Sequence, residues 1–186
     1  MKLTTQARTH ERKSDVAKLR RSGAIPGIIY KTDKEGEPIA INEQEFISHL
    51  RHVPSGRLAT SVFTLEDGKG KGRSAIVKDI QYHPVSYRVL HLDFEELHDK
   101  KSIKVKVPIV IEGEVDSVGV KLGGMVRLIV RNVKVQCLPK DIPHEFVVDV
   151  KNMNIGDVLR LSDLSMPNTV RPLMNPSVVV VSMVKK

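Results

Sequence analysis

Short segments of alternating apolar and polar residues recur along the whole chain, and this pattern is typical of half-buried β-strands. Val and Ile are plentiful, which favours strands over helices. In the first half, strands are predicted at residues 2–8, 28–30, 38–41, 58–65, 73–80 and 88–94. The charged, Gly-containing segment 66–72 predicts a hairpin connection between two of them. The chain is therefore expected to be mainly β, with a minor α component.

A short helix is predicted after the first strand. Ser14 fits the N-cap position, and Asp15 fits the first turn, where a carboxylate complements the helix dipole. Val16 and Leu19, three positions apart, form the apolar stripe expected to face the core. Gly23 supplies the stop signal that ends the helix.

A second helix is predicted in the middle of the first half. Asn42 and Glu45 have the spacing of a capping box, which satisfies backbone N–H groups at a helix start. Phe46 and Leu50 then give an apolar stripe at helical spacing. This helix is expected to end near His52.

The segment 95–101 is polar and charged, and it separates two strand-rich halves. We therefore expect two domains, residues 1–95 and 96–186. Strands of the second domain are predicted at residues 104–107, 126–138 (one bent strand or two), 145–150 and 177–184. Frequent turns between short strands indicate a β-rich sandwich or small barrel.

Basic residues are concentrated at the start of the chain. Seven of the first thirty residues are Lys or Arg and two are acidic, a net of +5 in a chain of +8, whereas residues 31–98 carry a net of −2. On a helical wheel, Lys18 and Arg21 lie opposite the apolar stripe, and Arg20 lies at its edge. Such a cluster indicates a polyanion-binding surface, and the alternative is a solvated arm without a partner.

Several classes of protein are disfavoured. Cys137 is the single cysteine and no apolar signal region is present, so a reducing cytoplasm is expected. The apolar runs are too short to span a bilayer, so no membrane association is expected. Gly68, Gly70 and Gly72 lie between two strands, whereas a phosphate loop opens a helix. No nucleophile elbow is present. The sequence thus predicts neither an enzyme nor a cofactor, metal or small-molecule substrate.

Polar chemistry in the first half falls on its last strand. Alternation places Leu90, Leu92 and Phe94 on one face and Val89, His91 and Asp93 on the other. His91 and Asp93 are then neighbours on a polar face, which has three interpretations. They bind a metal with His83, although a typical site needs three or four ligands; they form a solvated face; or they recognise a ligand through hydrogen bonds.

Two further side chains suit nucleic acid. Gln81 follows a strand and offers both a donor and an acceptor for a base edge. Tyr30 follows an apolar run, and it either stacks on a base or sugar or lies at the edge of the core.

Three ordered motifs carry a family resemblance. They are Leu-Arg-Arg-Ser-Gly-Ala-Ile-Pro-Gly-Ile-Ile-Tyr at residues 19–30, Val-Lys-Asp-Ile-Gln-Tyr-His-Pro at 77–84 and His-Leu-Asp-Phe at 91–94. They resemble the signatures of the bacterial large-subunit ribosomal proteins that bind 5S rRNA. Residues 107–157 of the second half are similar to the long form of that family, called CTC, the general stress protein.

The resemblance implies an N-terminal six-stranded-type β-barrel with short helices that binds the loop E region of 5S rRNA, followed by a β-rich C-terminal domain. It implies a cytoplasmic, ribosome-associated protein that is a monomer off the ribosome and contacts neighbouring large-subunit rRNA and ribosomal proteins. By motif position the RNA-binding residues are Arg8, Lys13, Arg20, Arg21, Tyr30, Gln81, His91 and Asp93, to which the helical wheel adds Lys18. A free-standing, stress-related protein that binds other structured RNA, such as tRNA, is the alternative.

The chain departs from the family pattern at three places. Arg12-Lys13-Ser14 stands where the family often has Gly-Lys-Gly, and Lys31 stands where it usually has Gly. Tyr82 occupies a position where some members carry Arg.

Overall fold

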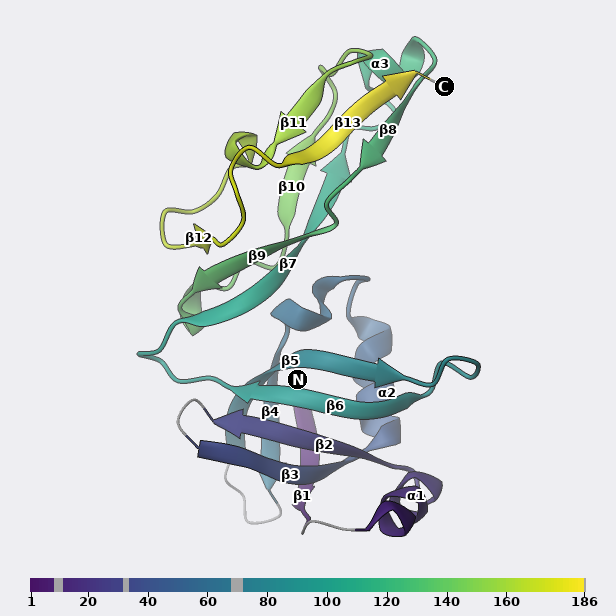
Figure 1. The fold of residues 1–186 in the computed structure, drawn as a ribbon, viewed down its shortest axis with the longest axis vertical. Helices are drawn as coiled ribbons and strands as arrows, with labels where there is room; N and C mark the ends of the chain where they lie inside the picture. The colour runs from purple at the N-terminus through teal and green to yellow at the C-terminus, as the bar shows by residue number, and fades with distance from the viewer. Residues whose placement is uncertain (9–11, 32–33, 68–71, 186) are drawn as a thin grey trace. The chain divides into compact units, whose positions relative to one another are not determined.

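The computed structural model describes residues 1–8, 12–31, 34–67 and 72–185, and these divide into two compact units, Met1–His98 and Asp99–Lys186 (Figure 1). Each unit is described by itself. The N-terminal unit contains β1 (Lys2–Ala7), α1 (Lys13–Arg21), β2 (Ala24–Lys31), β3 (Lys34–Asn42), α2 (Glu43–His52), the 3-10 helix η1 (Arg57–Thr60), β4 (Val62–Asp67), β5 (Gly72–Tyr82) and β6 (Val89–Glu96). No helix among the described residues is long and apolar enough to cross a membrane.

Six strands of the N-terminal unit form a closed barrel in the order β1-β3-β2-β6-β5-β4. Closure occurs where β1 pairs in parallel with β4, with Leu3 beside Leu65. Both of these side chains are almost completely buried, and Phe63 and Phe94 meet edge-on in the same core. The predicted six-stranded barrel is confirmed.

The second helix fits the barrel as its sequence predicts. The Asn42 side chain caps α2 by accepting hydrogen bonds from the backbone N–H groups of Gln44 and Glu45. The Glu45 carboxylate accepts instead from the backbone N–H of Thr4 in β1, 3.0 Å away, which ties the helix to the first strand. Phe46 is completely buried in the barrel core.

The start of the first helix differs from the prediction. Helix α1 begins at Lys13 and its N-cap is Arg12, which makes no side-chain capping hydrogen bond, so Ser14 lies inside the helix. The helix ends as expected, because Gly23 adopts the left-handed conformation (φ +81°) that favours glycine.

The prediction of a strand at residues 58–65 was wrong for the first part of that segment. Arg57–Thr60 forms the 3-10 helix η1, and the strand β4 begins only at Val62. The Thr60 and Ser61 hydroxyls donate to the carbonyl of Arg57, which satisfies the backbone locally in a turn conformation. These local hydrogen bonds favour a turn over the apolar alternation that predicted a strand.

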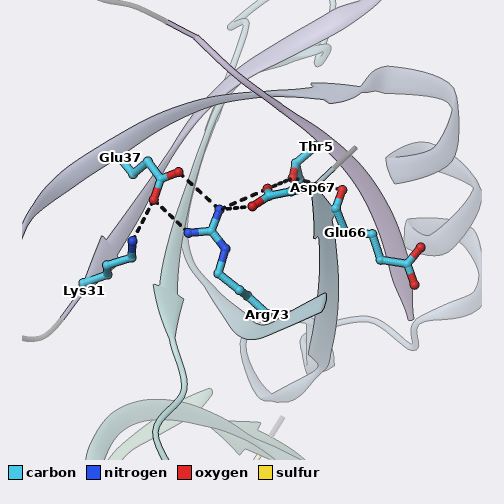
Figure 2. Close-up of polar contacts among 6 residues, drawn as sticks. All are labelled: Thr5, Lys31, Glu37, Glu66, Asp67 and Arg73. Atoms are coloured by element: carbon cyan, nitrogen blue, oxygen red, sulfur yellow. Dashed lines mark hydrogen bonds and ion pairs between the residues drawn. The ribbon is translucent and has the colours of Figure 1, made fainter. Parts of the chain in front are cut away.

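A polar network joins five of the six barrel strands (Figure 2). Arg73 of β5 is bound by Glu37 of β3 at 2.8 Å and by Asp67 of β4 at 3.0 Å. The Thr5 hydroxyl of β1 donates to Asp67, and Lys31 of β2 pairs with Glu37 at 2.8 Å. Hydrogen bonds from Arg73 and Lys31 lower the pKa of Glu37 to about 2. The network therefore holds the strands on both sides of the closure together.

The C-terminal unit contains two sheets around one core. The first has the order β10-β7-β9-β12, and the second has the order β11-β13-β8. Their bounds are β7 Ile103–Glu112, β8 Gly124–Leu128, β9 Asn132–Cys137, β10 Phe146–Asp149, β11 Val158–Arg160, β12 Arg171–Pro172 and β13 Val179–Lys185, with the short helices α3 Val118–Lys121, η2 Pro139–Asp141 and η3 Leu161–Asp163. The segment 126–138, predicted as one bent strand or two, contains the end of β8 and all of β9, separated by residues 129–131. Val133 and Val180, one from each sheet, are buried in the same cluster.

The Arg73 network predicts a specific acid sensitivity of the barrel. A carboxyl group whose pKa is lowered on folding stabilises the fold above its unfolded pKa, and this contribution is lost as protonation proceeds towards its folded pKa. For Glu37 we expect the loss between about pH 4.5 and 2. With solvent screening at a side chain that is 33% exposed, its size is about 1–2 kcal/mol.

Hydrogen exchange of the barrel strand amides measures this loss. Glu37→Gln is expected to be less stable at pH 7 and to have a flatter pH dependence between pH 4.5 and 2. Glu66→Gln, which removes only an exposed ion pair with Lys2, is the control. Equal pH dependence of Glu37→Gln and the unmodified chain would contradict the network's role.

Candidate nucleic-acid interface

The polar side chains of the last barrel strand lie next to those of its neighbours. Gln81 of β5 lies directly across from His91 of β6, and Asp93 lies beside Ile28 of β2. Leu92, between His91 and Asp93, is completely buried, so the two polar side chains share the outer face. We call Gln81, His91 and Asp93 the polar strip. The structure thus brings these three predicted residues together on adjacent strands.

His91 and Asp93 contact each other within the strip. The ring Nδ1 of His91 is 2.7 Å from Oδ1 of Asp93, in a contact that lacks hydrogen-bond geometry. Their side chains are only 17% and 23% exposed, whereas the Gln81 side chain is exposed. The His91 ring and the Asp93 carboxylate therefore lie against each other, and the solvated-face interpretation fits Gln81 better than it fits this pair.

Simple alternation failed at one end of this strand. Val89 was assigned to the same face as His91, but it is buried with 8% exposure, and Leu90 is only half-buried. The pairing of β5 with β6 shifts register between Gln81 and Tyr82, opposite this end of β6. A β-bulge changes the side to which the following side chains point, so Val89 turns inwards.

Arg20 holds the first helix against this strand. Its Nε and Nη2 atoms donate to the carbonyl oxygen of Leu90, at 3.2 and 3.0 Å. Leu90 immediately precedes His91, so the C-terminal end of α1 lies beside the polar strip. Arg20 was expected at the RNA, and the structure shows that two of its donors are occupied within the protein.

The other predicted basic residues differ in their availability. Arg21 is exposed, and Lys18 is exposed with a long 3.7 Å contact to Asp15. Lys13 opens α1, but its side chain lies outside the described residues. Arg8 follows β1 and donates from Nε to the carbonyl of Ile39. Three strand spacings separate β1 from β6, on the order of 14 Å, so Arg8 is not part of the strip.

Tyr30 lies further along the same barrel face. It belongs to β2, is 43% exposed and lies beside Glu95 of β6, two residues beyond Asp93. A Cβ atom on Gly36 would lie only 3.3 Å from the Tyr30 ring and 2.6 Å from the side chain of Ile28. The glycine therefore leaves room for the Tyr30 ring and the Ile28 side chain beside β3.

A groove of about 300 Å³ adjoins the C-terminal end of α1. Arg21, His83 and Arg88 supply cationic or donor groups to its lining, and Ile25 and Leu90 supply apolar surface. His83 Nδ1 faces the backbone N–H groups of residues 85 and 86, which places its proton on Nε2.

Arg88 is fixed by a bidentate pair with Glu43 of α2, and this pairing raises the pKa of Arg88. Arg88 was not predicted as a site residue, because its partner Glu43 is 45 residues distant in the sequence, and His83 was predicted only as a candidate metal ligand. Among the described residues no group of three or more His, Cys, Asp or Glu side chains could hold a metal ion.

Comparison with known proteins agrees with this geometry. The Ribosomal L25p family matches residues 3–94, and the C-terminal domain of ribosomal protein TL5 matches residues 102–186. Large ribosomal subunit protein bL25 of Chlamydia trachomatis serovar L2 is 40% identical over 186 residues, all of both chains. The same protein of Chlamydia abortus is 40% identical over 173 residues, 93% of each chain, and that of Chlamydia pneumoniae is 37% identical over 183 residues, 97% of this chain and 98% of the relative.

The closed barrel, its polar strip and these matches define a ribosomal protein of the large subunit, which is an RNA-binding and non-enzymatic component of translation. The chain belongs to the bL25 family, and it carries the TL5-type C-terminal domain. Family membership also implies association with the ribosome.

The clamp between Arg20 and Leu90 can be tested without RNA. Arg20→Lys keeps the charge but loses the planar fork that donates twice to one carbonyl. We expect faster hydrogen exchange at the amides of α1, while the core strand amides stay unchanged. Arg21→Lys is the matched control, because Arg21 is exposed. Equal protection of α1 in both variants would show that Arg20 does not hold the helix.

Proposed function

We propose that the N-terminal unit binds the loop E region of 5S rRNA and that the protein is thereby a structural constituent of the large ribosomal subunit. The observation that carries this proposal is the position of the polar strip beside a basic helix on one side of a rigid barrel. The family supplies the ribosome and rRNA as the general partners.

The proposed roles divide between anchoring and recognition. Lys18 and Arg21 contact phosphates from the exposed side of α1, and Arg20 positions that helix. Arg8 and Lys13 extend the phosphate contacts around the barrel. Gln81, His91 and Asp93 hydrogen-bond to 2′-hydroxyl groups or base edges, and Tyr30 packs against a sugar or base. The sites of charge and of recognition are therefore adjacent but distinct.

The shape of duplex RNA makes this arrangement suitable. Its deep major groove is closed to side chains, whereas its wide, shallow minor groove displays 2′-hydroxyls and base edges. A barrel face with a raised helix beside it fits across such a groove. Non-canonical pairs in an internal loop change the edges that the strip meets, which gives selectivity over a regular duplex.

The remaining partners follow from this role. We propose that the protein is cytoplasmic, is a monomer off the ribosome, and contacts neighbouring large-subunit rRNA and ribosomal proteins when assembled. The stress-related, free-standing alternative would place the same barrel face on other structured RNA, such as tRNA.

Recognition and anchoring are separable by substitution. Asp93→Asn is expected to narrow the affinity gap between a loop E fragment and a fully paired duplex, because the strip loses its carboxylate charge and replaces one acceptor oxygen with an amide donor beside His91. Arg21→Ala is the comparison. This variant should bind both RNAs more weakly and to the same extent. The slope of the logarithm of affinity against the logarithm of salt concentration should become shallower by about 0.7–0.9.

Titration of both RNAs over a range of salt concentrations measures these effects. Arg51→Ala, on the exposed side of α2, controls for the loss of one positive charge. If Asp93→Asn lost affinity equally for the two RNAs, Asp93 would have no part in recognising loop E. Tighter binding of tRNA than of the loop E fragment would favour the free-standing alternative.

A further inference from the structure

The C-terminal unit is the more basic half of the molecule. Residues 99–186 contain 14 basic and 9 acidic residues, a net of +5, whereas residues 1–98 carry +3. This charge is not accounted for by the site on the N-terminal unit. Its distribution over the C-terminal sheets therefore bears on what this unit binds.

One sheet face carries four of the fourteen basic residues of this unit. Along β7, Lys104 and Lys106 are exposed and alternate with the buried residues Val105 and Val107. Along β9, Lys134 is exposed between two buried valines. These lysines share the outer face of the sheet β10-β7-β9-β12, whose inner face lies on the core.

The strand register makes the charges contiguous. Lys106 lies directly across from Lys134, and Gln136 lies across from both Lys104 and Arg171 of β12. We call Lys104, Lys106, Lys134, Gln136 and Arg171 the basic face. It extends over three neighbouring strands that are about 4.8 Å apart.

The opposed lysines carry an energetic cost for the isolated protein. Side chains directly opposite each other on an antiparallel pair have Cβ atoms about 5 Å apart, and like charges there are destabilising. Within the part of the chain that the structure describes, Lys106, Lys134 and Arg171 have no ion pair with an acidic side chain. A bound polyanion would relieve this repulsion.

We propose that the basic face is a second RNA-binding surface, which contacts backbone phosphates without regard to sequence. The composition favours RNA over an acidic protein. Protein–protein interfaces are depleted in lysine and depend on buried apolar or aromatic anchors. The basic face has lysine, arginine and an amide but no such anchor, which is typical of a phosphate-binding surface.

This surface goes beyond the proposed binding of 5S rRNA by the N-terminal unit. Two RNA-binding surfaces on one chain allow it to contact two RNA segments, and the second contact gains from the high effective concentration set by the first. The C-terminal unit would thus strengthen ribosome association without any sequence-specific contact of its own.

The number of RNA molecules bound per chain tests this proposal. The full chain is titrated at low salt with a short RNA duplex of one helical turn that is unrelated to 5S rRNA, and complexes are counted by native mass spectrometry. We expect two duplexes on the unmodified chain and one on Lys134→Glu. Lys121→Glu, which makes the same charge change in α3 of the same unit, should still bind two.

The outcomes separate the two RNA sites. One duplex on the unmodified chain and none on Lys134→Glu would support the basic face and remove the site on the N-terminal unit. Equal numbers on the unmodified chain and Lys134→Glu would overturn the basic face. If Lys134→Glu bound RNA as well as the unmodified chain but associated more weakly with large subunits, the partner of the basic face would be an acidic protein. That outcome would also overturn the proposal.

Thermal unfolding provides a second readout that a purely structural role would not reproduce. Lys134→Glu converts a like-charge pair into an opposite-charge pair with Lys106, so the C-terminal unit should become more stable while it loses RNA affinity. The loss in affinity for the second duplex should be on the order of tenfold, with a shallower salt dependence. Lower stability of Lys134→Glu would contradict the repulsion on which the proposal depends.

Discussion

The barrel closes through the parallel pairing of β1 with β4, the first and last strands in the order β1-β3-β2-β6-β5-β4. Without this pair the six strands would form an open sheet with two free edges. A closed sheet has no free edge, so each strand has hydrogen-bonding partners on both sides. Arg73 strengthens the closure, since its guanidinium bridges carboxylates from β3 and β4, and Asp67 in turn receives the hydroxyl of Thr5 from β1. The positions of β6 and its neighbours follow from this closure.

The proposed RNA site depends on β6 being paired with β2 on one side and β5 on the other. The pairing brings Gln81 to His91, and the carboxylate of Asp93 lies 2.7 Å from the imidazole. Arg20 then fixes α1 to the same strand through the carbonyl of Leu90. The closed barrel, the contact of Arg20 with Leu90 and the contact of Asp93 with His91 thus place the residues proposed for recognition beside those proposed for phosphate contacts.

The sequence predicted the features that depend on local pattern. Strand alternation indicated the shared face of His91 and Asp93, Asn42 indicated the start of α2, and Gly23 indicated the end of α1. Prediction from the sequence failed where contacts between residues distant in the sequence determine the direction or partner of a side chain. The inward turn of Val89 follows from the shift in register between β6 and β5, which leaves Leu90 as the extra residue, and the role of Arg20 follows from a carbonyl 70 residues away. Ser14 failed as a cap because the helix starts at Lys13 without a side-chain cap.

Crosslinking of the purified full chain to total cellular RNA, with both crosslinked partners mapped, tests whether the N-terminal barrel binds 5S rRNA through β6 and its neighbours. We expect crosslinks between loop E of 5S rRNA and peptides from α1, the end of β5 and β6. Crosslinks from these peptides to other RNA, or crosslinks to loop E only from the opposite side of the barrel at β1 and β4, would contradict it.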